Sequence, residues 1–294
     1  MILLIKGNPD VLADGLPFCF IITQLKGNKR MFITNEKIDS GKPFDWGKTS
    51  EDYARFRDIY PEEFYRKLTE RGLCTEGQCV LDIGTGTGVL PRNMYRFGAK
   101  WTGTDISPEQ IAAAKRLSAA AGMDIAYYAL PTEALDFPEG SFDVITACQC
   151  FWYFDHKRVI PLLHGFLKPD GRLVVLYMAW LPFEDGIAGA SEKLVLKYSP
   201  EWSGAGETRH PIGIPEEAYE YFEMEYREEY DLWVPFTRES WHGRMKACRG
   251  VGASLSGEEL AAWEREHRQM LNERAPERFE ILHYAAMAVL KRRR

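Results

Sequence analysis

The residues that most constrain the fold of this chain are 80–89. They read VLDIGTGTGV, an apolar run followed by three glycines at alternate positions. Glycine lets a backbone turn sharply from a strand into a helix, and it leaves no side chain between the main chain and a bound ligand. This segment therefore predicts a strand, a tight turn and a helix of an α/β fold, with a nucleotide-like ligand against the turn.

The details of this turn indicate which ligand it suits. A dinucleotide-binding turn reads G-x-G-x-x-G, whereas here Gly88 comes one residue early and Val89 stands in the third place. The carboxylate of Asp82 would repel a pyrophosphate but could hold an ammonium group, directly or through water. Asp105 closes the next apolar run, roughly 20 residues on, where a strand-end carboxylate meets ribose hydroxyls. We expect a ribonucleoside with a positively charged tail.

These residues resemble the cofactor site of the class I S-adenosylmethionine-dependent methyltransferases. Other segments resemble the same family in its order, and an ordered set is more specific than one motif. The loop on the adenine side departs from the pattern, with Pro131-Thr132 where many relatives carry Asp-Ala. The resemblance covers roughly residues 44 to 180, and the further matching segments are 105–108, 132–138, 141–147 and 167–175.

Alternating strand-like and helical segments predict the fold class. Such alternation is typical of a parallel sheet covered on both faces. Two later strands are expected to form the antiparallel pair that ends this family's sheet. The prediction is an α/β, doubly wound, mostly parallel seven-stranded sheet of Rossmann-like type, with a helical N-terminal segment and a lid insertion. The expected strands are 79–83, 100–104, 125–129, 142–147, 172–178, 226–233 and 281–290, and the helices include 108–121 and 156–166.

We divide the chain into four parts. Residues 1–43 are expected to be an N-terminal arm, 44–180 the S-adenosylmethionine-binding core, 181–222 a lid or acceptor insertion, and 223–294 the end of the sheet plus a helical segment. A connection as long as the third part is usually functional. Translation is hypothesised to begin at Met31, since the preceding Lys-Gly codons suit a ribosome-binding sequence. The alternative is a genuine arm that packs on the domain or forms a dimer contact.

A helix is expected from residue 52 to Tyr60, where Pro61 would stop it. Tyr53 and Arg57 are four positions apart, hence on one face of that helix. In the resembling family an N-terminal helix closes over the cofactor, so these side chains could reach the methionine carboxylate. The alternative is a surface helix with a buried aromatic edge.

The resemblance implies S-adenosylmethionine as cofactor and S-adenosylhomocysteine as product. The candidate cofactor-binding residues are Tyr53, Arg57, Asp82, Gly84, Thr85, Gly86, Gly88, Asp105, Ile106, Thr132, Glu133 and Gln149.

The segment 148–155 is similar to the small-molecule branch of the family, which includes the trans-aconitate and ubiquinone-menaquinone type methyltransferases. Gln149 matches that branch, whereas Trp152 stands where a histidine is expected and Tyr153 where a tryptophan is expected. The aromatic run from Phe151 would place an apolar, cation-stabilising wall near the sulfonium. Core packing is the alternative, and it is expected for at least one of these rings.

The catalytic residues stay open. Candidates are Tyr153 and three basic side chains, with His242 and Arg209 as further options. The histidines are expected more often at a surface or interface, and the arginines would hold an acceptor carboxylate. Cys148 and Cys150 suggest thiol or metalloid methylation, since a C-x-C pair in an extended segment places both sulfurs on one side. The commoner role of such cysteines is that of buried small side chains. No metal site is expected. The three basic candidates are His156, His210 and Arg244.

The predicted reaction is in-line methyl transfer to an oxygen, nitrogen or carbon nucleophile of a small molecule, and a carboxylate is one of the acceptors considered. A cofactor-binding pseudoenzyme or partner platform is the alternative, and Val89 and Asp82 disfavour a nicotinamide oxidoreductase.

The net charge of −6 and the scattered basic residues argue against nucleic acid as a partner. Six cysteines without a C-x-x-C pair fit a reducing cytoplasm, and the interrupted apolar runs before residue 23 predict no membrane span. A monomer or homodimer is expected.

Overall fold

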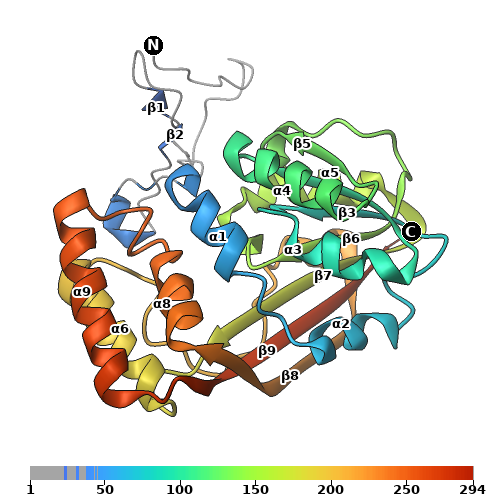
Figure 1. Cartoon of the computed structure of the whole chain (residues 1–294). Helices are drawn as coiled ribbons and strands as arrows, with labels where there is room; N and C mark the ends of the chain where they lie inside the picture. Colours follow the sequence, from blue (N-terminus) through green and yellow to red (C-terminus); the bar gives the residue numbers. More distant parts are fainter. Residues whose placement is uncertain (1–22, 25–30, 33–37, 43, 45, 294) are drawn as a thin grey trace.

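A computed structural model of the chain describes residues 23–24, 31–32, 38–42, 44 and 46–293 (Figure 1). The hypothesis of a start at Met31 concerns residues 1–30, most of which lie outside the described residues. Two short strands, β1 (Thr23–Gln24) and β2 (Met31–Phe32), pair with each other in antiparallel fashion.

A seven-stranded sheet forms the centre of the molecule and confirms the predicted fold class. The order across the sheet is β5-β4-β3-β6-β7-β9-β8, and only the pairings made by β9 are antiparallel. All seven expected strands are present. They are β3 (Cys79–Ile83), β4 (Lys100–Asp105), β5 (Ala126–Ala129), β6 (Phe142–Cys148), β7 (Leu167–Trp180), β8 (Phe222–Thr237) and β9 (Arg278–Arg292).

Helices cover both faces of this sheet, because its central strands are apolar on both sides. Successive residues of β3, such as Val80 and Leu81, belong to two different apolar clusters on opposite faces. Ser107 caps the helix after β4, where its hydroxyl accepts the Gln110 N–H. The helices that follow or precede the parallel strands are α2 (Glu62–Thr69), α3 (Val89–Met94), α4 (Pro108–Ala120) and α5 (His156–Phe166).

The N-terminal helix α1 (Ser50–Phe56) ends four residues before Tyr60, so the prediction of a helix to that residue was wrong. Ile59 and Tyr60 instead pack against the core, and Tyr60 stacks on Phe64 with ring centroids 4.5 Å apart. The burial of these two side chains therefore accounts for the early end of the helix. The restriction that Pro61 places on the backbone of Tyr60 would act only four residues later.

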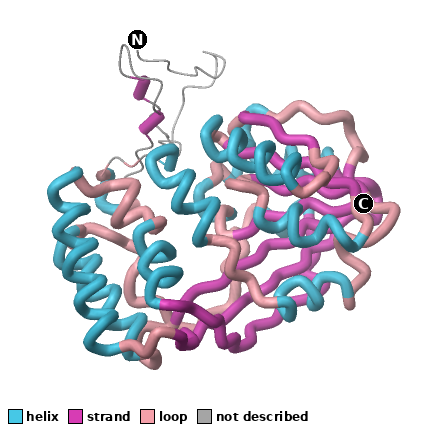
Figure 2. The backbone as a smooth tube through the Cα atoms, viewed as in Figure 1, coloured by secondary structure: helices cyan, strands magenta, loops and turns pink. Residues whose placement is uncertain are grey.

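A second group of helices lies at the far end of β7, β8 and β9 (Figures 1 and 2). It consists of α6 (Gly186–Tyr198), α8 (Arg238–Lys246) and α9 (Gly257–Arg274), while α7 (Ala218–Tyr221) is a short turn before β8. A capping box between Ser256 and Glu259 begins α9. Short 3-10 helices complete the fold: η1 (Asp39–Gly41), η2 (Trp46–Thr49), η3 (Tyr95–Phe97), η4 (Thr132–Ala134) and η5 (Phe151–Tyr153).

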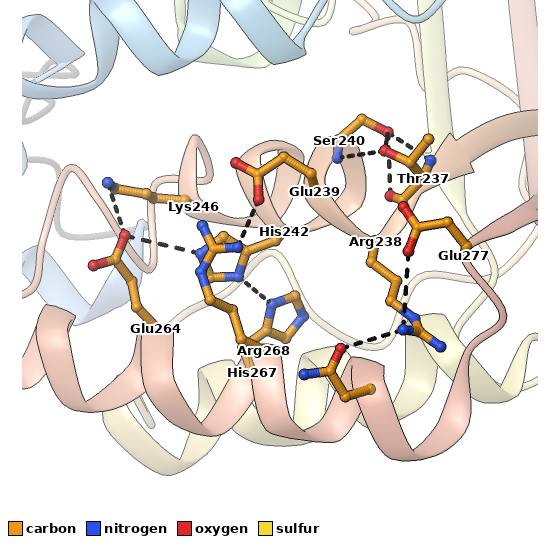
Figure 3. Close-up of polar contacts among 11 residues, drawn as sticks. Thr237, Arg238, Glu239, Ser240, His242, Lys246, Glu264, His267, Arg268 and Glu277 are labelled. Atoms are coloured by element: carbon orange, nitrogen blue, oxygen red, sulfur yellow. Dashed lines mark hydrogen bonds and ion pairs between the residues drawn. The ribbon is translucent and has the colours of Figure 1, made fainter.

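Polar contacts join α8 to α9 (Figure 3). The two Nδ1 atoms of His242 and His267 lie 2.9 Å apart in the buried layer between the helices. At the edges of this layer Lys246 pairs with Glu264 at 2.8 Å, and Arg268 pairs with Glu239 at 2.6 Å. His242 was expected at a surface or interface, and the surface position is wrong, because its side chain lies between α8 and α9 and is almost fully buried.

Candidate functional site

A cavity of about 620 Å³ opens at the carboxyl ends of the parallel strands, where open α/β sheets bind their ligands. Its walls come from the turns after β3, β4, β5 and β6, from the end of β7, and from three segments outside the sheet. Eight predicted cofactor residues lie on these walls: Arg57, Gly84, Gly86, Asp105, Ile106, Thr132, Glu133 and Gln149.

The turn after β3 requires glycine at two positions for different reasons. Gly84 has a φ of 61°, and a Cβ there would lie 2.7 Å from the sulfur of Cys150, a cavity-lining side chain. Gly88 has a φ of 74°, and a Cβ there would lie 2.3 Å from the hydroxyl of Tyr127. Gly84 thus lets the side chain of Cys150 pack against the backbone on the cavity wall, whereas Gly88, which is not on the wall, makes room for Tyr127.

The carboxylate of Asp105 joins the first two turns. It accepts hydrogen bonds from the backbone N–H of Gly86 at 2.9 Å and of Ser107 at 2.8 Å. Desolvation raises the pKa of Asp105, and these two N–H donors act in the opposite direction. A carboxylate held in this way on a cavity wall can still accept hydrogen bonds from hydroxyl groups of a ligand.

Asp82 lies beneath the turn rather than on the cavity wall. Its carboxylate is almost fully buried and accepts hydrogen bonds from the hydroxyls of Thr85 at 2.6 Å and Thr146 at 2.7 Å. Burial raises the pKa of Asp82 to about 7. Asp82 and Thr85 therefore support the conformation of the turn from behind.

Gln149 leaves the strand direction and crosses to β7. Its φ is 66°, its N–H donates to the carbonyl of Leu176, and its amide Nε2 donates to the carbonyl of Met178 at 2.5 Å. The extended geometry expected for the Cys148–Cys150 pair is therefore wrong, because the residue between them is left-handed.

Both cysteines on this wall are neutral thiols. Cys148 donates to the hydroxyl of Tyr60 at 3.5 Å, and Cys150 donates to the carbonyl of Ile83 at 3.0 Å. Burial raises the pKa of Cys148 to about 12 and that of Cys150 well above its usual range. Thiolate chemistry is disfavoured at such groups. Within the described part of the chain, no three His, Cys, Asp or Glu side chains gather as metal ligands.

The aromatic run after β6 is divided between the cavity and the core. Trp152, Tyr153 and Phe154 line the cavity, whereas Phe151 is fully buried in the core. His156 contacts the carbonyl of Phe151 at 2.9 Å and is not on the cavity wall. The side chain of Tyr53 lies outside the described residues.

Four segments meet over the cavity at the guanidinium of Arg249. It donates to both carboxylate oxygens of Asp39, at 2.6 and 3.0 Å, to the hydroxyl of Tyr153 at 2.6 Å, and to the hydroxyl of Ser203 at 3.0 Å. Asp39 also accepts the N–H of Ser203 at 2.7 Å. We call these four residues the Arg249 junction. Asp39 and Arg249 are 210 residues apart, so no sequence pattern could have paired them.

A second polar group surrounds Glu207, which sequence reasoning missed. Its carboxylate accepts hydrogen bonds from the hydroxyls of Tyr177 at 2.6 Å and Tyr284 at 2.9 Å, and it lies 2.8 Å from Nε2 of His210. Tyr177, Glu207 and His210 line the cavity. We call these four residues the Glu207 cluster, and its only sequence signal was His210.

The predicted arginines have different environments. Arg244 is buried on the cavity wall, donates to the sulfur of Cys248 at 3.2 Å and lies 4.9 Å from the ring centroid of Trp180. Arg209 is paired with Asp231 and Glu184 and does not line the cavity.

Comparisons with known proteins identify a domain that supplies part of the cavity wall. Residues 81–175 match the family model described as "Methyltransferase domain". The chain is 37% identical over 114 residues to a demethylmenaquinone methyltransferase of Thermus thermophilus, covering 38% of this chain and 52% of that protein. It is 35% identical over 154 residues to a ubiquinone biosynthesis O-methyltransferase of Bradyrhizobium sp., covering 50% and 59%. The chain thus spans somewhat more than half the length of these relatives.

A solved structure, YjhP from E. coli, shares the fold. It covers 84% of this chain and 99% of its own, with a TM-score of 0.50 and 20% sequence identity. In the described part of the chain, no helix combines the length and apolar character needed to cross a membrane.

Proposed function

We propose that the protein transfers a methyl group from S-adenosylmethionine to a small-molecule acceptor, because residues 81–175 match a methyltransferase domain and the relatives are named as methyltransferases. The observation that carries the proposal is the meeting of the glycine turn and the Asp105 carboxylate on one cavity wall.

The residues on the wall suit this cofactor. A cavity of about 620 Å³ is of the size that binds a small molecule. Gly84 and Gly86 belong to the cavity wall and carry no side chains, so a ligand can approach the backbone of the turn closely. Asp105 supplies an acceptor for ribose hydroxyls, and Trp152 and Tyr153 offer aromatic rings to a cation.

We assign roles by position along the cavity. Asp105 and Ile106 would hold the ribose, Thr132 and Glu133 the adenine side, and Arg57 the methionine carboxylate, for which its planar fork is suited. Gln149 would lie beside the methionine part. Asp82, Thr85 and Gly88 would act indirectly by supporting the turn, and Tyr53 stays in the proposal as a residue of α1.

The bound cofactor supplies a methyl group that is already activated on a sulfonium. The protein then has to align the acceptor with that group and exclude water. The Arg249 junction supports this role, because it brings the segments around Asp39 and Ser203 together over the cavity. We propose that residues 44–180 bind the cofactor and that 181–222 contribute to the acceptor site.

The free cysteines support a reducing compartment. The five that the structure describes form no disulfide, as expected for a protein of the cytoplasm. We propose that the protein acts there as a monomer or homodimer, without nucleic acid as a partner.

Calorimetry with S-adenosylmethionine and S-adenosylhomocysteine tests the cofactor site. We expect saturable binding by the parent and a loss of affinity of roughly 10- to 100-fold in Asp105→Ala, the effect of removing a charged hydrogen-bond acceptor. Asp124→Ala is the matched control, since Asp124 is exposed and does not line the cavity. Absent binding by the parent, or equal affinity in Asp105→Ala, would contradict the proposed site.

A further inference from the structure

The acceptor side of the cavity has two walls of opposite chemistry. Tyr177 and Trp180 both belong to β7 and both line the cavity, but they are three positions apart and so point to opposite faces of the sheet. Tyr177 contacts the carboxylate of Glu207, whereas Trp180 lies against the guanidinium of Arg244. A carboxylate therefore faces the cavity from one side of the strand and a cation from the other.

The carboxylate of Glu207 keeps room for one more hydrogen bond. A carboxylate has about four acceptor positions, and Tyr177, Tyr284 and His210 approach three of them. Desolvation, and then the negative charge of Glu207, raises the pKa of both tyrosines, so their hydroxyls remain protonated donors. The side chain of Glu207 is 19% exposed, and it faces the cavity.

The loop that carries Glu207 is fixed to the rest of the molecule. Its neighbour Gly206 donates its N–H to the carboxylate of Glu192 on α6 at 2.9 Å. The same carboxylate accepts the indole N–H of Trp180 at 2.5 Å. Because Tyr177 and Tyr284 hold Glu207 from β7 and β9, its carboxylate is positioned by several elements before any acceptor binds.

Two arginines of the cavity wall, Arg249 and Arg244, contact other side chains of the protein. Arg249 is neutralised by the bidentate contact with Asp39. Arg244 donates to Cys248 and lies on Trp180. The charged group on the Tyr177 side of the acceptor space is therefore Glu207, with His210 beside it.

We propose that Glu207 receives the proton that the acceptor loses, so that the acceptor is a molecule with an O–H or N–H nucleophile and its methylated group is not a carboxylate. This inference rests on the proposed function. The lone pair of the acceptor oxygen or nitrogen forms the bond to the methyl carbon while the carbon–sulfur bond breaks. The bonding pair stays on sulfur as a neutral thioether, and the proton passes to the carboxylate of Glu207.

An acceptor carboxylate does not fit this place. Two carboxylates within hydrogen-bonding distance repel each other unless one holds a proton. A carboxylate nucleophile also has no proton to give, so a fixed proton acceptor beside it would serve no purpose.

The test compares Glu207→Gln with the parent. The amide keeps the size of the side chain but is a very weak proton acceptor. Tritium transfer from S-adenosylmethionine is measured with two acceptors that bear X–H groups, catechol and tyramine, and with two carboxylates, benzoate and phenylacetate. We expect transfer by the parent to catechol or tyramine, and a fall in kcat of at least roughly 100-fold in Glu207→Gln, as for loss of a general base.

Two further readouts separate a proton acceptor from a structural residue. Affinity for S-adenosylhomocysteine should change by less than about twofold in Glu207→Gln, and KM for the acceptor should change less than kcat. Glu201→Gln is the matched control, since Glu201 lies exposed in the same loop and does not line the cavity. It should behave as the parent.

The remaining outcomes overturn the inference. Parent-like kcat in Glu207→Gln would exclude Glu207 as the proton acceptor. Transfer by the parent only to the carboxylates, or to neither X–H acceptor, would refute the acceptor class while the cofactor site stands. A parent that binds no S-adenosylhomocysteine would refute the proposed function, and this inference with it.

Discussion

At the scale of single residues, the glycines of the turn after β3 differ in what they make possible. The missing side chain at Gly84 makes room for Cys150, and that at Gly88 makes room for Tyr127. The same ring of Tyr127 would lie 2.7 Å from a Cβ at Gly103, and its hydroxyl contacts Ser118 at 3.1 Å. One tyrosine thus packs against two glycines, which connects the turn to the neighbouring strand and helix.

We expect Gly88→Ala to lower the free energy of unfolding by more than Gly72→Ala does. Both glycines have a positive φ, 74° and 65°, but nothing lies within 4 Å of a Cβ at Gly72. Each change costs about 1 kcal/mol of backbone strain, and Gly88→Ala adds about 1–3 kcal/mol for overpacking. Urea unfolding of the two variants measures the difference. Equal losses of unfolding free energy in the two variants would show that Tyr127 moves aside at no cost, which would contradict the prediction.

At the scale of elements, the α8–α9 layer contains two buried neutral histidines (Figure 3). Burial lowers the pKa of His242 to about 4 and, followed by the effect of His242, that of His267 to about 3. In the unfolded chain both pKa values return to about 6.5. The unfolded state therefore binds protons first as the pH falls, and stability is lost below about pH 6.5.

We expect this loss of stability to reach roughly 2 kcal/mol per histidine at pH 5, because the pKa of an unfolded histidine lies about 1.5 above that pH. The raised pKa of Asp82 acts in the opposite direction, since its contribution to stability is lost as the pH rises towards 7. The contribution of Asp82 is the same in the parent and in histidine variants, so comparing their pH dependence cancels it. Between pH 7.5 and 5, urea unfolding should show a larger loss in the parent than in the double variant His242→Asn, His267→Asn. His164→Gln, outside the layer, should keep the parent slope, and a double variant with that slope would refute the prediction.

The sequence predicted the strands better than their ends. All seven strands were found from apolar runs, but β8 runs from Phe222 to Thr237 where only 226–233 was expected. Its first residues include the charged Glu223 and Glu225, and its last residues include Pro235. Side-chain patterns hide these extensions, because the hydrogen-bonded ladder is made by the backbone. Site residues were predicted from the sequence where a single turn or strand end contains the recognisable motif, as at Asp105. Glu207 and Arg249 were missed, since their partners come from distant segments.

At the scale of the whole molecule, the Arg249 junction connects parts that the sheet does not. Asp39 precedes the domain core, Tyr153 follows β6, Ser203 lies in the loop after α6, and Arg249 follows α8. All except Asp39 line the cavity, and Ile38 beside Asp39 does so as well. A ligand in the cavity is therefore enclosed by segments that share one buried ion pair.

We expect Arg249→Met to accelerate the release of S-adenosylhomocysteine by at least roughly tenfold and to lower stability by about 3–5 kcal/mol, because it leaves the buried Asp39 carboxylate unpaired. Stopped-flow release and urea unfolding measure the two effects. Arg209→Met is the matched control, since its ion pairs are exposed and outside the cavity wall. A release rate unchanged from the parent would show that the junction does not retain the ligand.

The order of the sheet also has a consequence for synthesis on the ribosome. Among the described strands β8 pairs only with β9, which is made later in the chain. The nascent protein therefore carries β8 as an unpaired strand until residues 278–292 have emerged. Most of its exposed positions are charged, namely Glu223, Glu225, Arg227, Glu229 and Asp231, and the other two are Trp233 and Pro235. Charged side chains disfavour strand pairing between nascent chains that are translated from the same mRNA. They therefore protect β8 from aggregation until β9 has been synthesised.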